Sequence, residues 1–149
     1  MNRGTAFWDS SALIPLCVQE RASNKVKTVA KQFAPVVWWA TTVEIHSAIA
    51  RLHGSGELDD AGRQAALNRL SVLSRGWREV LPSDKLRDQA GVLVDTYSLR
   101  ASDSLQLASA MIWCQQRPAR RRFVSSDSRL CEAAAQAGFA IISPGLAIP

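Results

Sequence analysis

Apolar residues along the chain fall into two patterns: short continuous runs, and longer stretches in which they recur every three or four positions. Short runs rich in β-branched and aromatic residues are typical of buried strands, whereas the longer periodic stretches are typical of helices. The runs predict strands at residues 5–8, 35–39, 79–81, 123–124 and 139–142. The periodic stretches predict helices at residues 11–18, 22–33, 42–53, 58–73, 83–97, 102–115 and 128–137.

Strands that alternate with helices predict an α/β sandwich with a mainly parallel sheet. Ser83 and Ser102 are expected to cap two of the helices, because a serine hydroxyl accepts a hydrogen bond from the first turn. A length of 149 residues fits a single domain spanning residues 1–149. In folds of this class ligands bind beyond the carboxyl ends of the strands.

Composition limits the class of protein, the cellular compartment and the kind of partner that the chain can have. Hydrophobic residues make up 47% of the chain and charged residues 21%, which excludes wholesale disorder. No apolar run approaches the roughly 18–20 residues of a membrane span, and the N-terminus does not resemble a secretory signal. Three widely separated cysteines favour a reducing cytoplasm over a disulfide framework. The formal net charge of +5 is carried mostly by arginine, which permits a nucleic-acid partner but is equally expected from a GC-rich genome.

Four acidic residues lie at junctions where a helix begins. Asp9, Glu44 and Asp127 follow predicted strands, and Asp103 opens a helix after the turn at residues 100–102. Because the carboxyl ends of parallel strands meet at one edge of a sheet, we expect these side chains to lie close together.

Each acid alone has a simpler explanation as a helix cap. Asp9 and Asp127 fit N-cap positions, residues 41–44 (TTVE) resemble a capping box, and Asp103 follows the expected cap at Ser102. Four converging carboxylates, however, repel one another and raise each other's pKa unless a cation lies among them. Mg²⁺ and Mn²⁺ take oxygen ligands of this kind, whereas two histidines and no closely spaced cysteine pair leave zinc without support.

Four segments together resemble a known family. They are residues 7–14 (FWDSSALI), 42–51 (TVEIHSAIAR), 99–110 (LRASDSLQLASA) and 123–134 (FVSSDSRLCEAA). Over nearly its whole length the chain resembles the PIN-domain ribonucleases, specifically the VapC toxins of type II toxin–antitoxin pairs. This resemblance implies a three-layer α/β/α fold, Mg²⁺- or Mn²⁺-dependent cleavage of RNA, and a homodimer inhibited by a VapB-type antitoxin.

The resemblance also assigns roles to residues. The family's quartet of catalytic, metal-binding acids maps onto Asp9, Glu44, Asp103 and Asp127, and its supporting hydroxyl groups map onto Ser125 and Ser10. Phosphate contacts near this site are candidates at four arginines, although a solvated turn is the favoured explanation for the last three: Arg100, Arg120, Arg121 and Arg122.

Trp38 and Trp39 are expected in the core, and Trp77 is the better candidate for stacking on an RNA base.

The sequence argues against two other functional classes. A phosphate-accepting receiver domain would need a lysine near a late strand, and this chain has none after Lys85. A haloacid-dehalogenase-type phosphatase would need a second aspartate two residues after the first, and position 11 is serine. A catalytically weak PIN domain that binds RNA or protein remains the alternative.

Overall fold

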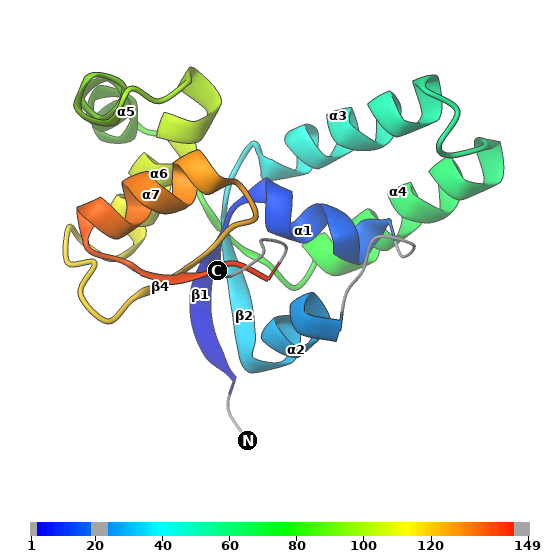
Figure 1. Cartoon of the computed structure of the whole chain (residues 1–149), viewed down its shortest axis with the longest axis horizontal. Helices are drawn as coiled ribbons and strands as arrows, with labels where there is room; N and C mark the ends of the chain where they lie inside the picture. Colours follow the sequence, from blue (N-terminus) through cyan, green and yellow to red (C-terminus); the bar gives the residue numbers. More distant parts are fainter. Residues whose placement is uncertain (1–2, 19–23, 145–149) are drawn as a thin grey trace.

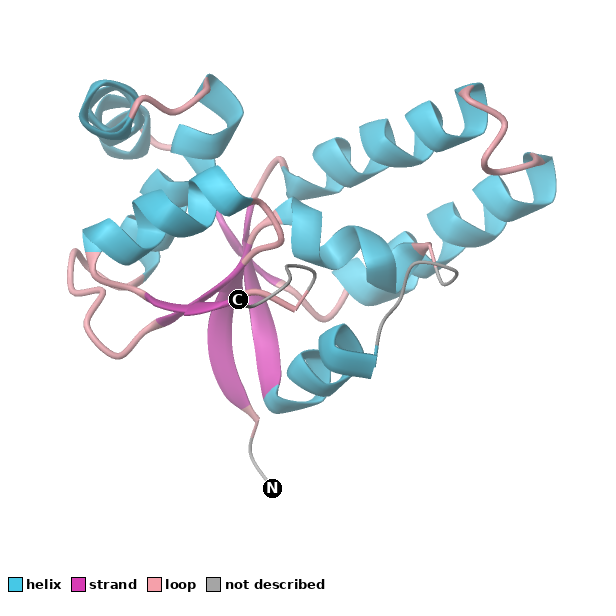
Figure 2. Ribbon diagram, in the orientation of Figure 1, coloured by secondary structure: helices cyan, strands magenta, loops and turns pink. Residues whose placement is uncertain are grey.

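A five-stranded sheet forms the centre of the molecule (Figures 1 and 2). The computed structural model describes residues 3–18 and 24–144. The strands follow the order β3-β2-β1-β4-β5, and every neighbouring pair is parallel. The strands are β1 (Gly4–Trp8), β2 (Phe33–Trp38), β3 (Arg78–Val80), β4 (Arg122–Val124) and β5 (Ala140–Ile142).

Four helices cover one face of the sheet. They pack on side chains such as Ala6, Trp8 and Val37, which alternate along the strands with residues of the opposite face. The third and fourth of these helices form a long hairpin that extends past the sheet (Figure 1). The helices are α1 (Ser10–Cys17), α2 (Asn24–Gln32), α3 (Thr41–Gly54) and α4 (Asp60–Ser74).

Three further helices cover the other face, against Phe7, Val36 and Phe123. The Phe7 and Phe123 rings stack with centroids 5.4 Å apart. Both faces of the strands are therefore buried, as continuous apolar runs require, and the three-layer α/β/α sandwich is confirmed. The helices are α5 (Asp84–Tyr97), α6 (Ala101–Trp113) and α7 (Ser128–Ala137).

The register of the central strands aligns their carboxyl ends. Trp8, the last residue of β1, pairs with Val124, the last residue of β4. Asp9 and Ser125 consequently leave the sheet side by side. The geometry that the sequence predicted for this edge thus follows from two strands that end in register.

Several boundaries differ from the predicted ones. Residues 22 and 23 of the helix predicted at 22–33 lie outside the described residues, and Phe33 begins β2 instead of ending that helix. Asp59, which accepts the Gly62 N–H at 2.7 Å, caps a helix that begins at Asp60 and not at residue 58. Ser83 is an N-cap as predicted, and its hydroxyl accepts the Leu86 N–H at 3.1 Å.

The prediction that Ser102 caps a helix is wrong. The helix begins at Ala101, its N-cap position is Arg100, and no side chain caps it. Trp39 was also placed wrongly in the core: it is 51% exposed, whereas Trp38 is 6% exposed. Trp39 follows the last residue of β2, and its ring lies edge-on to that of Trp38 with the centroids 6.3 Å apart, so Trp38 reaches the core and Trp39 stays at the surface.

The three cysteines lie in the interior of the fold. Cys17, Cys114 and Cys131 are buried and free. No helix in the described part of the chain combines the length and apolarity needed to cross a membrane.

Candidate active site

Asp9 is the most buried of the four acids. It follows β1 directly and is 4% exposed. Although it occupies the N-cap position of α1, its side chain makes no capping bond. Its Oδ2 accepts hydrogen bonds from the hydroxyls of Ser11 and Ser125, the latter at 2.8 Å. Burial raises the pKa of Asp9, the two serines oppose that rise, and the charge of Asp127 adds to it.

Glu44 reaches the same place from the first turn of α3. The capping box predicted here does not form, because α3 has Ala40 at its N-cap position and no side-chain cap. Glu44 Oε2 instead accepts from the Ser10 hydroxyl at 2.8 Å and from Gln106 Nε2 at 3.1 Å. Burial raises the pKa of Glu44, and both donors counteract the rise.

Asp103 lies in the first turn of α6 and is half-buried. Its carboxylate accepts no hydrogen bond from any residue that the structure describes. Burial raises the pKa of Asp103, and the charges of Asp127 and Asp9 raise it further. Arg100 and Arg129 act in the opposite direction. Asp103 therefore depends on distant charges alone for compensation.

Asp127 has a structural role in addition to its place in the site. It is the N-cap of α7, and its Oδ1 accepts the Leu130 N–H at 3.0 Å. Its own N–H donates to the Ser125 hydroxyl at 3.0 Å. The capping explanation is thus correct for Asp127 and incorrect for Asp9 and Glu44.

The four carboxylates line one open pocket of about 440 Å³. Within residues 3–18 and 24–144, none of them forms an ion pair with a basic side chain. As the side chains stand, no three His, Cys, Asp or Glu residues of that part of the chain are grouped closely enough to ligate one ion. The donors are nevertheless all oxygen atoms, which is the set that a hard divalent cation takes.

This combination of burial, mutual repulsion and carboxylates without an ion pair is costly to a protein unless something offsets it. A divalent cation or a positively charged ligand group would do so. The predicted site residues Asp9, Glu44, Asp103, Asp127, Ser10 and Ser125 are therefore brought together, and their metal-binding and catalytic roles stay predictions.

Comparison with solved structures places this arrangement in a known fold. No protein-family model and no curated protein matches the sequence. A toxin–antitoxin complex from Klebsiella pneumoniae is similar, with a TM-score of 0.66, 13% identity and coverage of 94% of this chain and 98% of that chain. FitAcB from Neisseria gonorrhoeae is similar with a TM-score of 0.64, 13% identity and coverage of 94% and 98%.

A third similar structure is PAE2754 from Pyrobaculum aerophilum, with a TM-score of 0.62, 16% identity and coverage of 93% of this chain and 89% of that chain. The chain has the PIN-domain fold. At these identities the likeness is one of fold, and the chemistry of this chain must be argued from its own residues.

The structure adds residues to the site that the sequence analysis did not single out. Ser11 donates to Asp9 and accepts the Ser126 N–H at 2.9 Å, so it joins the first turn of α1 to the loop after β4. Gln106, which is 1% exposed, holds Glu44. Arg51 lines the acidic pocket and donates to Ser47 Oγ at 2.8 Å. Spacing was the available signal: Gln106 follows Asp103 by three positions, and Arg51 follows Glu44 by seven.

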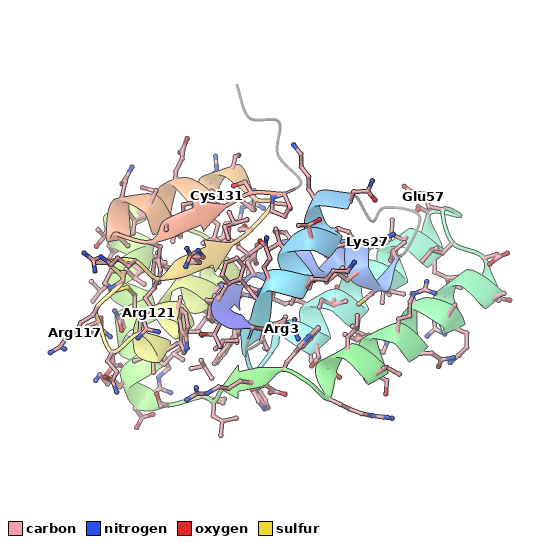
Figure 3. All side chains as sticks on the ribbon, turned by 90° about the horizontal axis from the view of Figure 1, so that it is seen from below. Arg3, Lys27, Glu57, Arg117, Arg121 and Cys131 are labelled. Atoms are coloured by element: carbon pink, nitrogen blue, oxygen red, sulfur yellow. The ribbon has the colours of Figure 1, made fainter. Side chains whose placement is uncertain are left out.

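The expectation that Arg120, Arg121 and Arg122 lie near the acids is wrong. Arg120 and Arg121 precede β4 and Arg122 is its first residue, whereas Asp127 follows it, so the three lie at the amino ends of the strands. Figure 3 shows Arg117 and Arg121 close together at the end of the molecule away from Glu57, in the segment that joins α6 to β4. Two guanidinium groups there lie over aromatic rings: Arg121 is 5.3 Å from the Trp113 centroid and Arg122 is 4.9 Å from that of Phe33.

The other predicted arginine is in place. Arg100 shares a hollow with Asp103 and Asp127, and Arg129 lines the same hollow. Trp77, the stacking candidate, is half-buried against the core of the α1–α4 side and does not line the acidic pocket.

Proposed function

We propose that this PIN domain is a divalent-metal-dependent endoribonuclease and the toxin of a toxin–antitoxin pair. The observation that carries the nuclease proposal is the pocket of four carboxylates, which interact electrostatically and lack any ion-pair partner in the described part of the chain. Such a pocket suits a substrate that arrives with its own cations, as a phosphodiester does.

In this proposal Asp9, Asp103 and Asp127 hold Mg²⁺ or Mn²⁺, and Glu44 completes the set or orients the attacking water. A bound divalent cation supplies a water of lowered pKa and offsets the charge that develops on the phosphate. Ser125 and Ser11 keep the Asp9 carboxylate fixed and charged. Ser10 and Gln106 do the same for Glu44.

The toxin role draws on the likeness of fold. Two of the similar structures are described as a toxin–antitoxin complex and as FitAcB, and a further one, with a TM-score of 0.66 and 11% identity, as FitAB bound to an IR36 DNA fragment. A cytoplasmic homodimer with RNA as substrate and a VapB-type antitoxin as inhibitor completes the proposal.

Cleavage of RNA by the purified, antitoxin-free chain tests the nuclease proposal. We expect cutting with Mg²⁺ or Mn²⁺, none with EDTA, and products with 5′-phosphate and 3′-hydroxyl ends, because water attacks and the RNA 2′-hydroxyl does not. Asp9→Asn and Asp103→Asn remove charge at nearly constant size, and we expect both to lower the rate by about a hundredfold or more.

Asp88→Asn is the matched control, because Asp88 is exposed on α5, outside the acidic pocket. It should cut like the parent chain. Cyclic phosphate ends, or cutting that persists in EDTA, would reject the mechanism. RNA binding without any metal-dependent cutting would favour the binding-module alternative.

A further inference from the structure

A second pocket lies beside the acidic site, between α7 and the turn that joins α5 to α6. It has a volume of about 250 Å³. One wall is the turn, with Tyr97, Ser98 and Leu99. The other wall is one face of α7, where Arg129, Glu132 and Gln136 are spaced so that they line up along the helix. The nuclease proposal uses none of these residues.

The turn is held in a fixed shape. Ser98 ends α5 in the left-handed region at φ 54°, which a serine adopts only when its surroundings require it. Its N–H donates to the Val94 carbonyl, as does that of Leu99 at 3.3 Å. Leu99 is buried, so the turn is anchored to the core on one side and presents Ser98 and Tyr97 to the pocket on the other.

The pocket neighbours the acidic site through shared lining residues. Arg129 lines it and also lines the hollow that contains Arg100, Asp103 and Asp127. That hollow shares Asp103 and Asp127 with the acidic pocket, which Arg51 also lines. A strand whose phosphate sits at the acids therefore meets several cationic groups, and past Arg129 it reaches the second pocket.

We propose that this pocket binds the base of an RNA nucleotide next to the phosphate that is cut. The inference rests on the proposed nuclease function and deepens it. Unpaired bases stack on aromatic rings and are read through hydrogen bonds at their edges. Tyr97 supplies the ring, Leu99 and Ala133 supply apolar surface, and three polar groups surround them: Ser98, Glu132 and Gln136.

The polar groups also give the pocket a preference. The Glu132 carboxylate only accepts hydrogen bonds, so it favours a base whose edge presents two adjacent donors. Guanine has such an edge, with its N1–H and its 2-amino group, whereas adenine, cytosine and uracil do not. The pocket therefore favours guanine at the adjoining position of the RNA.

Photo-crosslinking tests the pocket without relying on cleavage. The probe is a single-stranded RNA oligonucleotide that contains 6-thioguanosine, which keeps the amino group. It is irradiated with the full-length Asp9→Asn chain, and the adducts are mapped by mass spectrometry. We expect adducts within residues 97–99 or 129–136. An oligonucleotide that contains guanosine should compete for the probe better than one of uridine, adenosine or cytidine.

Two exposed substitutions sharpen the test with little risk to folding. Glu132→Gln and Gln136→Ala should each lower the adduct yield by about fivefold to tenfold, the ratio expected from one lost hydrogen bond to a charged or amide group. Glu132→Gln should also remove the discrimination in favour of guanosine, because an amide has only one acceptor oxygen. Gln64→Ala, an exposed change on α4, should leave both the yield and the discrimination unchanged.

The outcomes separate this inference from the nuclease proposal. Adducts confined to other segments, or yields that Glu132→Gln and Gln136→Ala do not change, overturn the pocket even where the parent chain cuts RNA with Mg²⁺. Adducts in the pocket of a chain that never cuts RNA support the pocket and overturn the nuclease. A pocket filled by a protein partner instead would give no RNA adducts there, which also overturns the inference.

Discussion

The Ser125 hydroxyl donates to Asp9 Oδ2 at 2.8 Å, and its Oγ also accepts a hydrogen bond from the Asp127 N–H at 3.0 Å. One small side chain at the end of β4 thus fixes the side chain of one acid and the backbone of another. Ser125 is 0% exposed and Asp9 is 4% exposed, so water cannot replace these bonds. Burial raises the pKa of Asp9, and this hydroxyl is one of the groups that oppose the rise.

Ser125→Ala should therefore affect both stability and titration. Without the Ser125 hydroxyl, the buried Asp127 N–H has no acceptor and Asp9 Oδ2 loses one donor. This loss should lower the free energy of unfolding by about 1–3 kcal/mol. The pKa of Asp9 should rise further, because a donor to its charged form is gone. Denaturant unfolding measures the first effect, and carboxyl-carbon NMR of Asp9 measures the second.

Ser109→Ala is the control for this change. Ser109 is equally buried, but its hydroxyl donates to the Leu105 carbonyl within α6. We expect a loss of about 1 kcal/mol or less, since that carbonyl keeps its helical hydrogen bond, and no change in the pKa of Asp9. An Asp9 titration that both alanine variants shift equally would contradict the role given to Ser125.

Gln106 is expected to position Glu44. Its Nε2 lies 3.1 Å from Glu44 Oε2 and 3.2 Å from Thr41 Oγ1, while its Oε1 is buried without a hydrogen-bond partner. Gln106→Met keeps the length and removes the unsatisfied oxygen, so the free energy of unfolding should change by less than about 1 kcal/mol. The rate of RNA cleavage should fall by about tenfold, as for other groups that orient ligating carboxylates.

A purely structural role for Gln106 predicts something else. It would change stability and leave the titration of Glu44 where it is. We expect the pKa of Glu44 to rise in Gln106→Met, because a hydrogen bond to the charged form is lost. The acid limb of the cleavage profile should move to higher pH together with the Glu44 carboxyl resonance.

The fold was predictable because its signals are local. Strands buried on both faces appear as short apolar runs, and the helices between them carry apolar residues at helical spacing. The predicted boundaries failed where a neighbour decides the outcome. Phe33 continues a helical pattern, yet it pairs with Gly4 as the first residue of β2. Ser102 has the chemistry of a cap, but the helix begins one residue before it.

The site was predictable only in part, for a similar reason. Acids that follow parallel strands must meet, so the four carboxylates could be named from the sequence. The same rule should have moved residues 120–122 away from them, because that basic run lies at the start of a strand. Partners such as Ser11 and Gln106 depend on which side chains face each other across elements, and single-sequence patterns do not contain that information.

Arginines at the two edges of the sheet should behave differently toward RNA. Arg51 is exposed and lines the acidic pocket, whereas Arg117 is exposed at the amino ends of the strands. Arg51→Gln should weaken the binding of single-stranded RNA by about threefold to tenfold at moderate salt and reduce the salt dependence by about one phosphate contact. Fluorescence anisotropy with a labelled oligonucleotide over a salt series measures both. Arg117→Gln should match the parent chain, and an equal loss from both variants would mean that the binding is unspecific.

Asp103→Asn should stabilise the metal-free protein at neutral pH while it abolishes cleavage. Burial and the neighbouring acids raise the pKa of Asp103 above its ordinary value of 3.8, so the folded state binds more protons than the unfolded state between these two values. The penalty of the charged carboxylate is therefore absent below that range and complete above the raised pKa. Because Asp103 is half-exposed, water screens part of the repulsion, and we expect a gain of about 0.5–1 kcal/mol in EDTA.

The pH dependence and the response to metal identify the cause of that gain. Unfolding curves should show it shrinking as pH falls through the raised pKa of Asp103 toward 3.8, where both chains carry a neutral group. Added Mg²⁺ or Mn²⁺ should raise the melting temperature of the parent chain more than that of the variant, because binding to the folded state alone is stabilising. Asp88→Asn should show neither effect. A gain that stays constant down to acid pH would instead point to better packing of the amide, and the electrostatic account of the pocket would fail.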